Sequence, residues 1–346
     1  MGPAVPANGL LSAFSHGNTA HAIMAPMSAA SPSILRAGAA LVLAGAGLWA
    51  QPPFGGPQPE GMRQAQQLMR EGKTDEALAA VRAQLKASPD SPQVASAAGN
   101  LLDLMGRGTE ARQAFQKAID LAGTPAAKAN AERAMAMSYA FDSDCKNTAK
   151  YEQMVFDYWV TQTSTDPHNA WYQQGEMADE AARVCIDAGD LDTAYKYYKL
   201  GFDAGIKEPD IPPARRALWD YRWEHAQARI AARRGNHEEA EKHVAAARAA
   251  LERITAADAG QGNQQKQFFP YLTGYVAFYA GDYKTALADF QQASTNDPFI
   301  QCMIGQTYEK LGEKEKAMEA YRKAAATSAH NPPAAYARPY ARKKLG

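Results

Sequence analysis

The sequence predicts an all-α protein, a right-handed α-solenoid of about seven stacked helical hairpins. Three observations predict this fold class. A fixed spacing of glycine and alanine recurs along the chain, bulky apolar residues follow each glycine at a constant distance, and strand-like runs of β-branched residues are missing. The 346 residues are 46% hydrophobic and 21% charged, values typical of a folded soluble protein rather than a disordered one.

The recurring unit is a glycine followed five residues later by an alanine. A small residue lies seven positions before each glycine, and a bulky apolar residue lies nine positions after it. We interpret the glycine as the end of a first helix and the small residue as its close contact with the alanine of a second helix. One hairpin leaves an apolar face uncovered, so the units are expected to stack. The glycines are Gly72, Gly106, Gly189, Gly235, Gly281 and Gly312.

This spacing resembles the tetratricopeptide repeat, a helical hairpin of about 34 residues. Gly72 and Gly106 keep that period, whereas Gly189, Gly235 and Gly281 are 46 residues apart. The longer period lies in the range of HEAT-type repeats, but the spacing of small residue, glycine and alanine favours the tetratricopeptide repeat. We expect lengthened helices there, with loops at residues 206–213 and 259–264.

The first fifty residues differ in composition from the rest. Residues 1–36 hold no acidic group, and the apolar run 37–50 is too short to span a bilayer as a helix. Residues 1–50 are therefore expected to be an N-terminal extension and signal peptide, and 51–60 a Pro/Gly-rich linker. An uncleaved anchor or a buried helix is the alternative for the apolar run. We expect an exported bacterial protein, periplasmic or at the cell surface, without a stable membrane span after cleavage.

The remaining chain, residues 61–346, is expected to form the solenoid. A degenerate hairpin at about 126–165 turns at residues 142–144, where no glycine is present. A capping helix is expected at about 333–345, after the last hairpin.

Three cysteines are an odd count for an exported chain. Cys145 and Cys185 are expected on one edge of neighbouring hairpins, where a disulfide is geometrically possible. Two buried thiols are the alternative. Cys302 is expected to be a small core or groove residue.

No motif for catalysis, for a cofactor or for a metal is found, so we do not expect an enzyme. His237 and His243 are six residues apart, which places them on poorly matched faces of a helix. Lysine plus arginine equals aspartate plus glutamate, 37 each, so no nucleic-acid partner is expected.

The resemblance places the first helix of each hairpin on an inner, concave face, with inner positions at fixed places of the repeat. These positions form an arginine-rich row beside an aromatic row, and arginine with tyrosine is a favourable combination for holding a peptide. The lysine and asparagine with which related proteins hold a terminal carboxylate are not reproduced. Packing inside the solenoid is the alternative role. The predicted partner-binding residues are Arg222, His225, Arg229, Arg233, Tyr271, Tyr275, Phe278 and Tyr279.

The resemblance therefore implies a non-catalytic scaffold that binds a protein or peptide segment in its concave face. The alternative is a structural spacer or assembly factor of a cell-envelope or pilus complex that uses its convex face or its ends. A helper domain of an enzyme is the least favoured hypothesis. The sequence does not indicate the partner or the oligomeric state.

Overall fold

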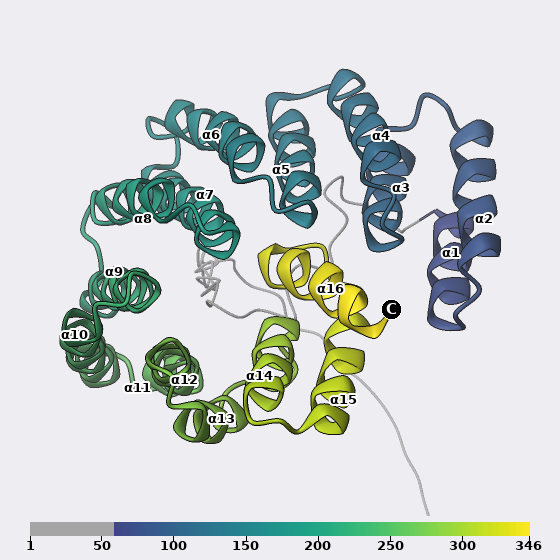
Figure 1. The fold of residues 1–346 in the computed structure, drawn as a ribbon. Helices are drawn as coiled ribbons and strands as arrows, with labels where there is room; N and C mark the ends of the chain where they lie inside the picture. The colour runs from purple at the N-terminus through teal and green to yellow at the C-terminus, as the bar shows by residue number, and fades with distance from the viewer. Residues whose placement is uncertain (1–58) are drawn as a thin grey trace, which may run out of the picture. The chain divides into compact units, whose positions relative to one another are not determined.

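The structure, a computed structural model, describes residues 59–346. The expected signal peptide at 1–50 and the linker up to residue 58 lie outside the described residues. The described part contains α-helices and no β-strand. Consecutive helices pair as hairpins, which confirms the predicted α-solenoid (Figure 1).

Seven hairpins follow one another along the described chain, with one short helix between the fifth and sixth and one helix after the last. They are α1 (Glu60–Arg70) with α2 (Thr74–Ala87), α3 (Pro92–Leu104) with α4 (Gly108–Asp120), α5 (Pro125–Phe141) with α6 (Cys145–Thr161), α7 (Pro167–Ala188) with α8 (Leu191–Gly205), α9 (Pro213–Arg233) with α10 (His237–Ala257), α12 (Phe269–Ala280) with α13 (Tyr283–Gln292), and α14 (Pro298–Lys310) with α15 (Lys314–Ala325). The short helix is α11 (Ala259–Lys266), and the final one is α16 (Pro332–Leu345).

The repeated glycines end the first helices of six hairpins in the left-handed conformation. Gly189 caps α7 with φ 90°, and Gly281 caps α12 with φ 84°. A residue with a Cβ would be strained there, which explains why glycine recurs. The third hairpin turns without glycine: Ser143 takes φ 57°, and the Asp144 carboxylate accepts a hydrogen bond from the backbone N–H of Asn147 to start α6.

The small residues of the repeat make room for an aromatic ring. A Cβ added at Gly305 would lie 2.5 Å from the ring of Tyr321, and one added at Gly99 would lie 2.5 Å from the ring of Phe115. Both rings are fully buried. The aromatic ring of the second helix also reaches across this seam, so it too requires a position without a side chain.

The lengthened helices of the central hairpins dock through a tryptophan. Trp219 on α9 is fully buried, and a Cβ at Gly175 on α7 or Gly205 on α8 would lie within 2.2 Å of its ring. These two glycines therefore form the recess that seats the indole. Trp223, one turn later, is only partly buried.

The predicted loop at residues 259–264 is wrong, because this segment forms most of α11. The Asp258 carboxylate accepts a hydrogen bond from the backbone N–H of Gln261 and so starts the helix. Gly262 lies against Thr255 so closely that a Cβ would be 2.4 Å from its hydroxyl. A glycine-containing segment is thus helical here because it packs back onto α10.

The last helix contacts hairpins far from it in sequence. Besides α14 and α15, α16 packs against α5 and α7 (Figure 1). Ala334 and Ala335 share an apolar cluster with Leu104 and Phe141. Just before α16, the His330 imidazole lies 2.8 Å from the Asp103 carboxylate, so the C-terminal segment is bound to the second and third hairpins by both apolar and polar contacts.

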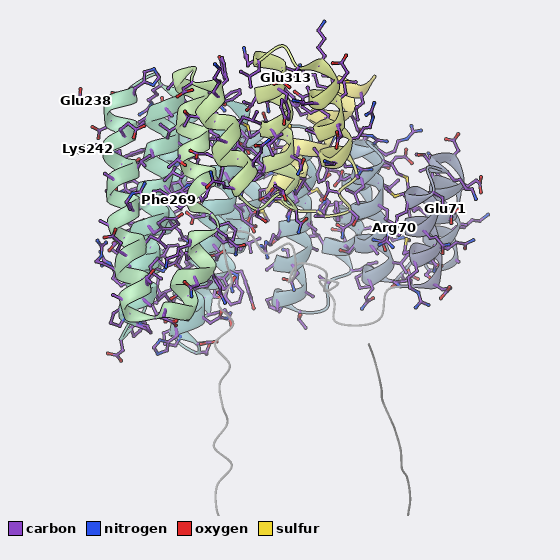
Figure 2. All side chains as sticks on the ribbon, turned by 90° about the horizontal axis from the view of Figure 1, so that it is seen from below. Arg70, Glu71, Glu238, Lys242, Phe269 and Glu313 are labelled. Atoms are coloured by element: carbon purple, nitrogen blue, oxygen red, sulfur yellow. A yellow bond between two sulfur atoms is a disulfide. The ribbon has the colours of Figure 1, made fainter. Side chains whose placement is uncertain are left out.

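Charged residues cover the outer side of the hairpins. Glu238 and Lys242 on α10 are exposed to solvent, and Figure 2 shows them at the edge of the molecule. No helix in residues 59–346 has both the length and the apolar character that a membrane crossing requires.

The glycine–aromatic seam gives a direct test of packing. Gly305→Ala is expected to lower the free energy of unfolding by about 1–3 kcal/mol, because the buried Tyr321 ring cannot move away without strain. Gly123→Ala is the matched control, since a Cβ there meets nothing within 4 Å. Urea denaturation of both variants measures the difference, and equal midpoints would contradict the packing role of Gly305.

Candidate functional site

The inner positions of α9 and α12 lie next to each other, as the repeat predicts. Arg222, His225, Arg229 and Arg233 follow one face of α9 at three- and four-residue steps. The aromatic residues of α12 face them: the Tyr271 ring lies 5.2 Å from the His225 ring, and α9 contacts α12 directly. The solenoid therefore brings all eight predicted residues into one region.

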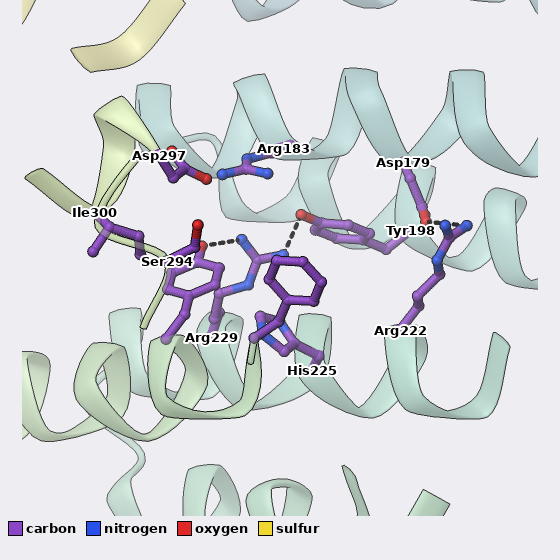
Figure 3. Close-up of a pocket in the computed structure, with 11 residues that line it drawn as sticks. Asp179, Arg183, Tyr198, Arg222, His225, Arg229, Ser294, Asp297 and Ile300 are labelled. Atoms are coloured by element: carbon purple, nitrogen blue, oxygen red, sulfur yellow. Dashed lines mark hydrogen bonds and ion pairs between the residues drawn. The ribbon is translucent and has the colours of Figure 1, made fainter. Parts of the chain in front are cut away.

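A cavity of about 40 Å³ lies between α7, α9 and α12 and the segment that leads into α14. Figure 3 shows Arg183 and Asp179 entering it from α7, Arg229 from α9, and Asp297 from the start of α14. Its lining combines these charged groups with the rings of Tyr198, Phe268 and Tyr271. A volume of this size accepts about three water molecules or one small polar group.

Arginine and tyrosine side chains bind each other across this region. The Arg229 guanidinium donates hydrogen bonds to the hydroxyls of Tyr271, at 2.9 Å, and Tyr198, at 2.5 Å. Arg233 donates to the Tyr279 hydroxyl at 2.9 Å and lies over its ring. The arginine row of α9 and the aromatic row of α12 thus form one hydrogen-bonded layer.

Burial divides the eight predicted residues into two groups. Arg233 and Tyr279 are partly exposed. The other six are at most 9% exposed and pack in the interior in this structure, as the alternative interpretation proposed. For those six, contact with a partner stays a prediction. They are Arg222, His225, Arg229, Tyr271, Tyr275 and Phe278.

The inner positions of α7 were missed at the sequence level. Glu176, Asp179, Arg183 and Asp187 lie on the face of α7 that meets α9, and Asp179 and Arg183 line the cavity. The same repeat frame, applied through Gly189, gives these four positions directly. The signal was therefore present in the sequence, in the hairpin whose first helix ends at Gly189.

An ion-pair cluster joins α7 to α9. Arg222 is paired with Glu176 and lies 4.0 Å from Asp179. Burial raises the pKa of Asp179 to about 7, although the positive charge of Arg222 acts in the opposite direction. Burial likewise raises the pKa of Asp187 to about 6. Part of the acidic charge on α7 is therefore neutralised by protons near pH 7.

His225 behaves in the opposite way. Its burial lowers the pKa of the imidazole well below the ordinary value of 6.5, and the positive charge of Arg229 lowers it further. The ring is neutral at physiological pH, and the positive charge of this region comes from arginine alone.

Two segments match models of a known family. Residues 62–136 and residues 300–331 each match a tetratricopeptide repeat model. The chain contains tetratricopeptide repeats in these two segments. No curated protein matches it in sequence.

Solved structures with a similar arrangement include a tetratricopeptide repeat protein from Parabacteroides merdae. It is 14% identical, with a TM-score of 0.40, over 77% of this chain and 91% of that chain. The P58(IPK) TPR domain is 10% identical, with a TM-score of 0.23, over 83% of this chain and 97% of that chain. Because both TM-scores are below 0.5, neither structure informs the site.

Two of the three cysteines lie at the edge of the third and fourth hairpins. Cys145, at the start of α6, is joined by a disulfide to Cys185, near the end of α7. Cys302 on α14 is a buried free thiol, and burial raises the pKa of that thiol to about 12. The Cys302 thiol is therefore protonated and unreactive.

Clusters that resemble catalytic sites do not have the required geometry. Ser138 and His330 both bind the Asp103 carboxylate, at 2.9 Å and 2.8 Å, and within the described residues no hydrogen bond joins the serine hydroxyl to the imidazole. His243 pairs with Glu224 and Glu239 instead of His237. No group of three or more potential metal ligands occurs within residues 59–346.

The raised pKa of Asp179 predicts a pH-dependent stability. The folded-state pKa of about 7 exceeds the unfolded value, so folding binds a proton, and this stabilisation is complete at low pH and is lost as pH rises through 7. Asp179→Asn cannot lose that proton. Its free energy of unfolding, minus that of the wild type, is expected to rise from pH 4 to pH 7 by at most about 1.4 kcal/mol per pH unit.

Urea denaturation at pH 5 and pH 8 measures this difference. Asp187 and His225 also titrate on unfolding, but they are present in both proteins and cancel in the comparison. Parallel pH profiles for the two proteins would contradict a raised pKa at Asp179.

Proposed function

We propose that this protein is a non-catalytic interaction scaffold that holds a segment of another protein against its inner face. Tetratricopeptide repeats support a role in protein–protein interaction. The single observation that carries the proposal is the layer of arginine, acidic and tyrosine side chains on α7, α9 and α12. Stacking needs only apolar faces, and burying charges costs stability, so this layer is explained better by recognition than by packing.

The partly exposed members of the layer are the best placed to contact a partner. Arg233 and Tyr279 lie at its accessible edge, near the turn at Gly189, where a Cβ would be 3.7 Å from the Arg233 guanidinium. A neighbouring protein segment can accept a hydrogen bond from Arg233 and cover the tyrosine ring without rearranging the buried residues. Helix α16 already covers α5 and α7 on the inner side, so the proposed segment lies beside it over α9 and α12.

Affinity capture tests the inner-face proposal. The wild-type protein, Arg233→Ala and Arg234→Ala are immobilised and exposed to an envelope extract of the source cells. Arg234 is the matched control because it is exposed and pairs with Asp192 on the outside. We expect a captured protein to fall at least tenfold for Arg233→Ala and to be unchanged for Arg234→Ala, with equal melting temperatures for all three.

Cross-linking of the captured protein decides between the two faces of the solenoid. Cross-links to α9 and α12 support the inner face. Cross-links confined to the outer side, where Met154, Val160 and Tyr195 are exposed, would contradict it and favour the structural spacer.

We also propose that the protein is exported. The apolar run at 37–50 between a single basic residue and a Pro/Gly-rich segment supports a cleaved leader. The Cys145–Cys185 disulfide supports the same compartment, because such bonds persist in oxidising surroundings.

Intact mass of the protein from its native host tests export. We expect a chain that begins near Gln51 in the extracytoplasmic fraction, with two cysteines resistant to alkylation. A variant lacking residues 1–50 is expected to stay in the cytoplasm with all three cysteines alkylated after unfolding. A wild-type chain of full length in the cytoplasm would refute the proposal.

A further inference from the structure

The contact between α6 and α7 joins the third hairpin to the fourth. Part of its apolar packing comes from small side chains, because Ala149 on α6 and Ala178, Ala181 and Ala182 on α7 share one buried cluster. An alanine side chain buries less apolar area than a larger one and so stabilises a contact less. The α6–α7 contact also contains a buried pair of carboxyl groups and a disulfide, which together decide how firmly it closes.

Glu152 carries a carboxyl group into the middle of this contact. It lies on α6 and is 1% exposed, and within residues 59–346 no donor reaches either of its oxygens. Glu180 on α7 is close enough for a hydrogen bond between the two carboxyl groups. Two ionised carboxylates can only accept hydrogen bonds, so this bond requires a proton on one of them. Without the proton, the contact would bury two anions side by side, which is costly.

The groups that face Glu152 come from the helices on both sides of it. Burial and the negative charge of Glu180 raise the pKa of Glu152 well above its ordinary value of 4.5, and Arg133 on α5 opposes them only in part. The Nε of Arg133 donates to the Glu180 carboxylate at 2.8 Å, and Glu176 on α7 also acts on this guanidinium. Tyr197 on α8, whose own pKa is raised by burial, completes the surroundings.

The Cys145–Cys185 disulfide closes the same contact from the start of α6 to the end of α7. Cys185 is fully buried, whereas Cys145 is 7% exposed, so a dithiol from solution reaches the Cys145 sulfur first. One thiolate of the dithiol attacks that sulfur, and Cys185 leaves as a thiolate and takes a proton. The second thiolate then displaces Cys145, so the dithiol leaves as a disulfide and both protein cysteines become thiols.

We propose that the α6–α7 contact is a joint of the solenoid with two independent constraints, the proton between Glu152 and Glu180 and the Cys145–Cys185 disulfide. With the disulfide formed, the joint stays closed whether or not the proton is present. After reduction, loss of the proton leaves two carboxylates facing each other, and the joint opens. Because α16 contacts both α5 and α7 on the inner side, opening changes the angle between the two hairpins without separating them (Figure 1).

The buried thiol of Cys185 provides a direct measure of opening. In the full chain with Cys145→Ala, Cys185 is a free thiol inside the contact, and Cys302 on α14 is a second buried thiol outside it. The protein is treated with methyl methanethiosulfonate at pH 6 and pH 8, and mass spectrometry of peptides gives the rate at each cysteine. Each rate is divided by that of the chain unfolded in urea at the same pH, which removes the pH dependence of the thiol itself.

We expect the relative rate at Cys185 to rise by about tenfold or more from pH 6 to pH 8, and the rate at Cys302 to stay constant. The closed joint binds the extra proton, so its stabilisation is complete below the ordinary pKa of 4.5 and is lost as pH rises towards the raised pKa of Glu152. A rate at Cys185 that does not rise would overturn the proposal. Equal rises at Cys185 and Cys302 would indicate unfolding of the whole chain and would overturn it as well.

Glu152→Gln in the Cys145→Ala protein tests the proton itself. Glutamine donates to Glu180 without titrating, so we expect a slow rate at both pH values. Glu238→Gln in the same background is the matched control, because Glu238 is exposed on α10, and it is expected to keep the rise. Asp179 also titrates near pH 7, but it is present in all these proteins and cancels. An equal rise with Glu152→Gln would refute the role of the shared proton.

Small-angle X-ray scattering of the wild type tests the disulfide as the second constraint. The oxidised protein and the protein reduced with a phosphine are compared at pH 6 and pH 8, and we expect a larger radius of gyration only after reduction at pH 8. Expansion of the oxidised protein at pH 8, or no expansion of the reduced one, would contradict the proposal. If Cys145→Ala does not fold, the reduced wild type replaces it in the labelling, with Cys185 and Cys302 measured in the same way.

Discussion

The structure depends on one constraint: a helical hairpin can bury its second apolar face only against the next hairpin. Within a hairpin, the two helices meet where a residue without a side chain lies against an aromatic ring, as at Gly305 with Tyr321. Each seam fixes the rotation of its first helix. Since the inner positions of the repeat follow from that rotation, the same packing that stabilises the hairpins aligns Arg229 with Tyr271 across two of them.

The inner layer shows how charge is accommodated in such a stack. Tyrosine hydroxyls and rings surround Arg229 and Arg233, so each guanidinium has hydrogen bonds and a polarisable face in place of bulk water. The acidic residues of α7 respond to the same burial by holding protons near neutral pH. The layer is thus ordered before any partner arrives, which reduces the entropy lost on binding.

Residue spacing in the sequence was sufficient to predict the hairpins and to predict which rows of residues lie next to each other at the candidate site. The left-handed glycines, the lengthened helices and the adjacency of the rows on α9 and α12 all follow from spacing. The extent of burial could not be predicted, because it depends on how tightly successive hairpins stack. Arg183 also occupies an inner position of the repeat, counted back from Gly189. The packing of α11 on α10 and of α16 on α5 involves tertiary contacts that override weak local propensity, as the glycines of 259–264 illustrate.

The docking of α16 alters how the whole solenoid must assemble. Arg338 donates hydrogen bonds to the backbone carbonyl of Leu104, more than two hundred residues earlier, and to that of Thr327 nearby. Neighbouring helices can pair soon after synthesis, whereas this contact forms only after the chain has been synthesised beyond Arg338. Without this contact, the solenoid would unfold from its ends, one hairpin at a time. The contact joins the second hairpin to the C-terminal helix, so thermal unfolding becomes more cooperative.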